Sequence, residues 1–133
     1  STAVGAAAGT KKMVFVAIGH VAFFYDRNAL WHPHVGVNLR IILLNNDGGG
    51  IFRMIEGPRQ LPEREKFFET PHHLTAERTA QDANLEYYCC TTWDELNHHL
   101  PDFIAPWGRS KLLEIKTDMA INEAVFNTYK AWL

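Results

Sequence analysis

Hydrophobic residues fall along the chain in two patterns that alternate. Short, nearly continuous apolar runs occupy residues 13–19, 39–44, 85–90 and 111–116, and such runs are typical of strands buried in a parallel sheet. Apolar side chains recur at helical intervals in residues 21–31, 75–84, 92–103 and 118–132. The alternation predicts an α/β fold, a doubly wound and mostly parallel sheet flanked by helices.

Residues 39–52, LRIILLNNDGGGIF, carry the strongest chemical signal. The predicted strand is followed by three polar residues, Asn45 to Asp47, then by three glycines, and the apolar pattern resumes at Ile51. At the carboxyl ends of parallel strands, loops meet helix N-termini in a crevice that favours phosphate groups. The side-chain oxygens suit a hard cation such as Mg²⁺, which bridges phosphates. A glycine-rich turn without a ligand is the alternative interpretation.

Three other local signals concern the elements that follow. Thr92 and Glu95 have the spacing of a capping box, and Pro101 is expected to kink or shorten the helix that this box opens. Residues 53–71, interrupted by glycine and prolines, predict a surface excursion with a short helix around 63–68. Such a long insertion is more often functional or interface-forming than idle, and a solvated loop is the alternative. The last helix, from Asp118, is expected to carry its apolar residues on one face.

Length and composition narrow the class of protein. The chain has 133 residues, 47% of them hydrophobic, so residues 1–133 are expected to form one domain with a real core. A net charge of −2 without a basic stripe disfavours nucleic acid as a partner. No apolar run has the length of a membrane span and no leader-like segment is present, so a cytoplasmic protein without membrane contact is expected.

The two cysteines and the first nine residues give two further indications. Cys89 and Cys90 are neighbours, which disfavours an ordinary disulfide between them, and they are expected to be reduced thiols within a strand. The first residues, STAVGAAAG, are compatible with a helix but lack a capping signal, which indicates that the chain is a fragment.

Two motifs together resemble the diphosphate-binding domain of thiamin-diphosphate enzymes. That family carries Gly-Asp-Gly and, after a variable run, Asn-Asn; here Gly19-His20 and Asn45-Asn46 hold the equivalent places, each at the end of a predicted strand. The stretches FFYDRNAL, IILLNNDGGGIFRMI and RQLPEREKFFETPH resemble, more closely, the 2-succinyl-5-enolpyruvyl-6-hydroxy-3-cyclohexene-1-carboxylate synthases of menaquinone biosynthesis. The resemblance covers essentially the whole chain and implies a C-terminal cofactor-binding domain of a larger enzyme.

The resemblance also implies roles for individual residues, none of them catalytic. The side chain of Asn46 and the backbone carbonyl of Gly48 match the positions that hold Mg²⁺, or Mn²⁺ in its place, against the cofactor diphosphate. The residues implied as contacts of the cofactor or of the substrate pocket are Val21, Ala22, Gly49, Ile51 and Phe52. The alternatives are a turn amide that caps the next helix for Asn46, and plain core packing for Ile51 and Phe52.

One position departs from the family pattern. His20 stands where the family has its metal-binding aspartate, and an imidazole suits Zn²⁺ or Cu²⁺ far better than Mg²⁺. Affinity for Mg²⁺ is therefore expected to fall, and an ordinary turn or core histidine without a metal role is the alternative. The other histidines, among them His34, occur mostly as near neighbours in sequence, and no metal cluster is expected from them.

For the whole enzyme, the resemblance implies decarboxylation of 2-oxoglutarate on thiamin diphosphate and addition of the succinyl unit to isochorismate. It also implies a homo-oligomer, with an activating glutamate and substrate-binding arginines on N-terminal segments that this chain does not contain. The chain alone is thus expected to be inactive. Two rivals stay open: a non-catalytic binding or assembly module, and another thiamin enzyme such as an acetolactate synthase or 2-oxoacid decarboxylase. A nicotinamide-binding Rossmann domain is less favoured, because the glycines lack the fingerprint spacing.

Overall fold

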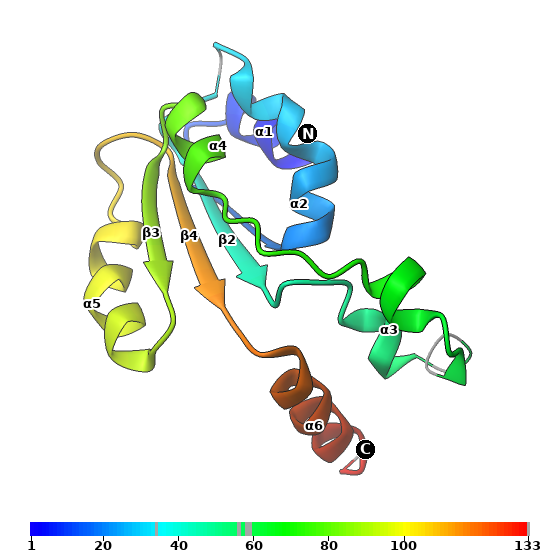
Figure 1. Cartoon of the computed structure of the whole chain (residues 1–133). Coiled ribbons are helices and arrows are strands. Elements are labelled where there is room, and N and C mark those ends of the chain that lie inside the picture. Colours follow the sequence, from blue (N-terminus) through cyan, green and yellow to red (C-terminus); the bar gives the residue numbers. More distant parts are fainter. Residues whose placement is uncertain (34, 56, 58–59, 133) are drawn as a thin grey trace.

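A parallel sheet is the centre of the molecule (Figure 1). The computed structural model describes residues 1–33, 35–55, 57 and 60–132, so His34 lies outside the described residues. Within them, β1 (Val14–Gly19), β2 (Leu39–Asn45), β3 (Glu86–Cys90) and β4 (Lys111–Lys116) form one sheet in the order β1-β2-β4-β3. Every neighbouring pair is parallel, which confirms the predicted fold class and strands.

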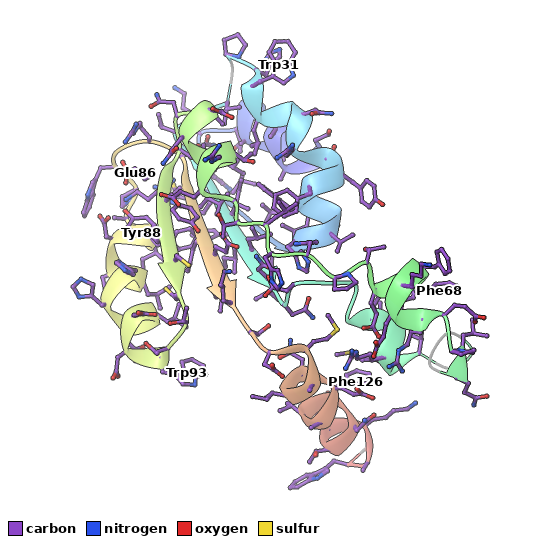
Figure 2. The ribbon with its side chains drawn as sticks, viewed as in Figure 1. Trp31, Phe68, Glu86, Tyr88, Trp93 and Phe126 are labelled. Atoms are coloured by element: carbon purple, nitrogen blue, oxygen red, sulfur yellow. The ribbon has the colours of Figure 1, made fainter. Side chains whose placement is uncertain are left out.

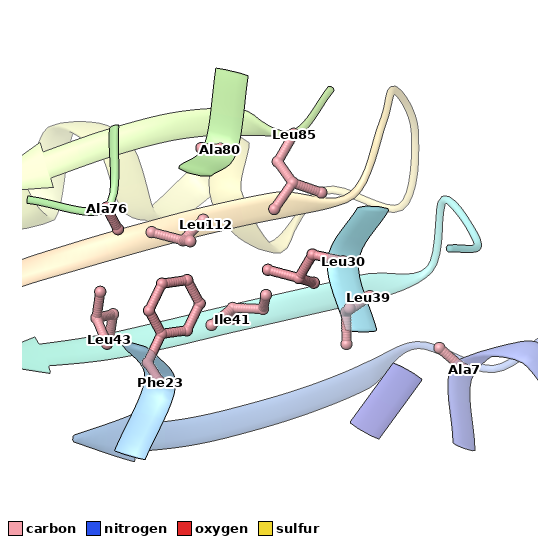
Figure 3. Close-up of a cluster of buried hydrophobic side chains, with 10 residues drawn as sticks. All are labelled: Ala7, Phe23, Leu30, Leu39, Ile41, Leu43, Ala76, Ala80, Leu85 and Leu112. Carbon is pink, nitrogen blue, oxygen red and sulfur yellow. The ribbon is translucent and has the colours of Figure 1, made fainter. Parts of the chain in front are cut away.

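Helices cover both faces of this sheet. On one face lie α1 (Thr2–Ala8), α2 (His20–Asp26), the 3-10 helix η1 (Arg27–Trp31) and α4 (Glu77–Asp82). Their small and aromatic side chains pack on the central strands, as Figure 3 shows for Phe23 against Leu43 and Ile41. On the other face α5 (Trp93–Ile104) places Phe103 against Leu113 and Cys90. Burial of these apolar side chains is the main force that holds the layers together.

Two short helices and the last long helix lie beyond the carboxyl ends of the strands (Figure 1). They are α3 (Ile51–Met54), the π-helix η3 (Arg64–Glu69) and α6 (Met119–Lys130). The helix η3 occurs where the sequence predicts a short helix within the excursion. The apolar face of α6 is not packed on the sheet, so Val125 and Tyr129 remain 63% and 62% exposed.

Several expectations about single elements are settled by the structure. The capping box is present: Glu95 N donates to Thr92 Oγ1 at 3.2 Å, and Thr92 N donates to Glu95 Oε2 at 3.1 Å. Pro101 does not end α5, which continues through it to Ile104, and the expected kink stays a prediction. Cys89 and Cys90 are free thiols on β3, as predicted. No helix of the described residues is long and apolar enough to cross a bilayer.

Candidate functional site

The tips of β1 and β2 lie side by side, because their parallel register pairs Gly19 with Leu44. A cavity of about 850 Å³ opens at this edge of the sheet, within the roughly 300–1,000 Å³ usual for small-molecule sites. All eight site residues named from the sequence line it: His20, Val21, Ala22, Asn46, Gly48, Gly49, Ile51 and Phe52. The two motifs therefore meet around an open space, as their positions at neighbouring strand ends require.

The opposite wall of the cavity was not predicted. It comes from Thr117, directly after β4, and from Asn122, Val125, Phe126 and Tyr129 of α6. Figure 2 labels Phe126 on α6, beyond the strand ends. The sequence signal for this wall was the apolar face of the last helix. The sequence predicts that face but not its position beside the cavity. Asn122 donates to Thr117 Oγ1 at 2.8 Å, so one hydrogen-bonded polar pair lies on an otherwise mostly apolar wall.

The turn after β2 owes its shape to Asp47 and to close packing of the glycines. Asp47 has a φ of 58°, a left-handed conformation that aspartate tolerates better than most residues. The glycines are needed for space: a Cβ on Gly49 would lie 2.9 Å from the carbonyl oxygen of Phe68, and one on Gly48 would lie 3.0 Å from that of Glu69. None of the three has a positive φ. The glycine run thus permits the following segment to pack directly on the turn.

A partly buried ion-pair cluster, with Glu69 enclosed between two arginines, holds that following segment in place. Arg53 of α3 donates to both carboxylate oxygens of Glu69 at 2.9 and 2.8 Å, and Arg64 Nε lies 2.6 Å from the same carboxylate. The hydrogen bond to Glu69 raises the pKa of Arg53. Gly49 N donates to the backbone carbonyl of Glu69 at 2.7 Å. Arg53, Arg64 and Glu69 of the excursion therefore support the turn beside the cavity, while other described residues of the excursion, such as Leu61 and Phe67 at 44% and 65% exposure, face solvent.

His20 begins α2 and is almost fully enclosed, at 2% exposure. Its Nδ1 lies 3.3 Å from the carbonyl oxygen of Leu44, and its ring meets the ring of His72 with centroids 4.6 Å apart. Burial lowers the pKa of His20, and the nearby His72 acts in the same direction. The structure thus surrounds His20 with packing partners, which favours a neutral imidazole, but its buried Nε2 has no hydrogen-bond partner among the described residues. The metal role of His20 stays a prediction.

The charges around the cavity bear on which metal could bind there. Among its described lining residues there is no aspartate, glutamate, lysine or arginine. The oxygen donors are all neutral: the backbone carbonyls of the turn, the side-chain amides of Asn46 and Asn122, and the hydroxyls of Thr117, Tyr25 and Tyr129. No group of three or more His, Cys, Asp or Glu in the described part of the chain is arranged to hold a metal ion. Neutral oxygens alone are a poor set for Mg²⁺, which is usually bound through one or two carboxylates together with phosphates. The donor set therefore does not fit a strong Mg²⁺ site.

Known proteins resemble the chain over nearly its full length. It is 48% identical over 130 residues to a 2-succinyl-5-enolpyruvyl-6-hydroxy-3-cyclohexene-1-carboxylate synthase of Cytophaga hutchinsonii, an alignment that covers 98% of this chain and 23% of that protein. The synthase of Christiangramia forsetii is 42% identical over 97% of the chain and 22% of its own length. The synthase of Porphyromonas gingivalis is 37% identical over 100% of the chain and 23% of its own length. The chain belongs to this synthase family. No protein-family model matches it.

The solved structures give an independent view of the fold. A benzoylformate decarboxylase from Polynucleobacter necessarius superposes with a TM-score of 0.67 at 18% identity, over 88% of this chain and 23% of that one. At this level of identity the likeness concerns the fold alone. The chain spans about 23% of the length of the synthases it matches, so the synthase family is represented here by one α/β unit.

Proposed function

We propose that this α/β unit is the diphosphate-anchoring domain of a thiamin-diphosphate-dependent synthase of menaquinone biosynthesis. The whole enzyme would decarboxylate 2-oxoglutarate and add the succinyl unit to isochorismate, as a cytoplasmic homo-oligomer with further domains on the same chain. Membership of the synthase family supports the proposal. The single observation that carries it at the level of the site is the cavity between the β1 and β2 tips, which both motifs line.

The residues divide into two groups within this cavity. The Asn46 side chain and the Gly48 carbonyl would face the diphosphate and its cation, while Val21, Ala22 and Gly49 would offer close backbone. Ile51 is 60% exposed, and with Phe52 it would line the pocket beside the thiazolium ring and substrate. When bound, thiamin diphosphate supplies the electron sink for decarboxylation and carbon–carbon bond formation. The contribution of these residues is to bind it, orient it and shield it from water.

Restoring the missing carboxylate tests this proposal. In the full-length protein, thiamin diphosphate should bind saturably in the presence of Mg²⁺. His20→Asp adds an anionic oxygen ligand beside the turn, so it should lower the Kd by about tenfold or more. His98→Asp, the same substitution on α5 away from the cavity lining, is the matched control and should leave the Kd unchanged. Failure of both the wild type and His20→Asp to bind the cofactor in a titration would refute the proposal.

One observation favours a second function. The absence of any carboxylate among the described lining residues, with a histidine at the family's aspartate position, fits a unit that has lost cofactor binding and retains an assembly role. Product analysis with 2-oxoglutarate and isochorismate separates the two, because only the synthase forms the carboligation product. The same analysis distinguishes the synthase from an acetolactate synthase or another 2-oxoacid decarboxylase.

A further inference from the structure

A buried carboxylate lies behind the turn that carries Asn46. Glu114, in the middle of β4, is completely enclosed at 0% exposure. Its Oε1 accepts from Asn45 Nδ2 at 2.5 Å, and its Oε2 accepts from Ala76 N at 2.9 Å and from the Tyr87 hydroxyl at 2.6 Å. All three partners are donors, so Glu114 acts as an acceptor at both oxygens. Burial and this hydrogen bond raise the pKa of Tyr87, which keeps the hydroxyl protonated as a donor.

Asn45 connects this carboxylate to the turn. Its side-chain nitrogen donates to Glu114 and also to the carbonyl of Leu74 at 2.9 Å, while its side-chain oxygen accepts from Asp47 N at 3.0 Å. The side chain is 1% exposed, and these three bonds use both amide hydrogens and the oxygen. Because Glu114 and Leu74 offer only acceptors here, the nitrogen of the amide must face them. The oxygen is then left to face Asp47.

The orientation of this one amide decides the shape of the turn. The bond from Asp47 N is a local side-chain-to-backbone contact of the kind that stabilises tight turns. It supports the left-handed conformation of Asp47, whose carbonyl in turn accepts from His72 N at 2.9 Å. With Asp47 fixed on one side and β2 on the other, Asn46 and Gly48 are held at the edge of the cavity. The two adjacent asparagines therefore have different tasks.

We propose that Glu114 is a positioning residue for the cofactor site, acting through the Asn45 amide on the turn that carries Asn46 and Gly48. The inference rests on the proposed function for what the turn binds. Glu114 does not line the cavity, so its effect on binding is indirect. Loss of the acceptor at Glu114 Oε1 removes one of the three bonds that fix the Asn45 amide, and the turn then samples conformations that move both cofactor contacts.

Glu114→Gln tests the claim with almost no change of volume. A glutamine can present its oxygen to Ala76 and Tyr87 only if its nitrogen faces Asn45, where two donors would then meet. Either this donor–donor contact remains, or the Asn45 amide turns over and loses both its bond to the Leu74 carbonyl and the bond from Asp47 N. Both outcomes loosen the turn. In the full-length protein the Kd for thiamin diphosphate with Mg²⁺ should rise about tenfold, the usual effect of losing one well-formed interaction. Tyr87→Phe removes a donor from the same carboxylate without touching Asn45, and should change the Kd by less than about twofold.

A swap of the two groups separates positioning from general loss of packing. In the double variant Glu114→Gln with Asn45→Asp, residue 45 accepts from the new glutamine and from Asp47 N but no longer donates to the Leu74 carbonyl, so the recovery is expected to be partial. Hydrogen exchange of the Asp47 amide is the readout that does not depend on cofactor: it should be faster in Glu114→Gln, unchanged in Tyr87→Phe and slowed again in the double variant. Unchanged exchange in Glu114→Gln, or an equal acceleration in Tyr87→Phe, overturns the inference. Absence of cofactor binding in wild type and His20→Asp refutes the proposed function instead, and the exchange data still decide the role of Glu114.

Discussion

Gly49 shows at the scale of one residue why the cofactor turn needs glycine. A Cβ there would lie 2.9 Å from both Phe52 Cδ2 and the carbonyl oxygen of Phe68, and a backbone oxygen has little room to move. Gly49→Ala should therefore lower the free energy of unfolding by about 1–3 kcal/mol, as overpacking usually does. Urea denaturation followed by circular dichroism measures this change.

Gly19 offers a matched control for that substitution. A Cβ on Gly19 would meet no atom of the described residues within 4 Å, and its backbone φ of −73° suits alanine. Gly19→Ala should change the free energy of unfolding by less than about 0.5 kcal/mol. Equal losses in the two variants would contradict the packing explanation, because both glycines lie in the lining of the same cavity.

His20 makes stability depend on pH in a predictable direction. Burial lowers its pKa in the folded chain below the ordinary 6.5, so the unfolded chain takes up a proton here at a higher pH than the folded chain does. Stability should thus fall as the pH drops through 6.5 and level off below the lowered pKa. His20→Gln should lose less stability over this window, in denaturation measured at a series of pH values. His98→Gln, a change at an exposed histidine, should follow the wild type; the same slope in His20→Gln would contradict the prediction.

At the scale of elements, the start of α5 is held by its capping box. Thr92→Ala removes the acceptor for Glu95 N and should lower the free energy of unfolding by about 1 kcal/mol.

The hydrogen bond from Thr91 N lowers the pKa of Glu95 below its ordinary 4.5. The contribution of the Glu95 carboxylate to stability is therefore complete above pH 4.5 and is lost as the pH falls through the lowered pKa. The advantage of wild type over Glu95→Gln in thermal unfolding should shrink accordingly. An advantage that persists at low pH would show that the carboxylate charge is not what matters.

The same element shows how far local sequence signals reach. The capping box was predictable because its donors and acceptors lie within four residues, and the strands because continuous apolar runs suit a sheet covered on both faces. The passage of α5 through Pro101 was not predictable, since packing of Phe103 at 0% exposure on the sheet outweighs a local helix penalty. Local propensity therefore predicts that a helix or strand forms, whereas tertiary packing decides at which residue it ends.

One wall of the candidate site was predictable from the sequence and the other was not. Its near wall follows two strand tips that sequence reasoning could bring together, because neighbouring parallel strands end at one edge. Its far wall and the contact between His20 and His72 join segments distant in sequence, and no periodicity encodes such contacts. The role of Asn45 was missed for a related reason. Its partner Glu114 lies on β4, which becomes a neighbour only once the strand order β1-β2-β4-β3 is known.

For the whole molecule, the apolar face of α6 predicts self-association. Ile121, Val125 and Tyr129 are each more than 60% exposed and recur every four residues on one side of the helix. A contiguous apolar surface of this kind is typical of an interface. The chain should therefore associate as its concentration rises, and Val125→Lys should shift the equilibrium towards monomer by about tenfold or more in sedimentation equilibrium, since a lysine is costly to desolvate. Ala124→Lys adds the same charge at an exposed position beside that face and should have a smaller effect. Equal effects of the two lysines would attribute the change to net charge and refute the role of the face.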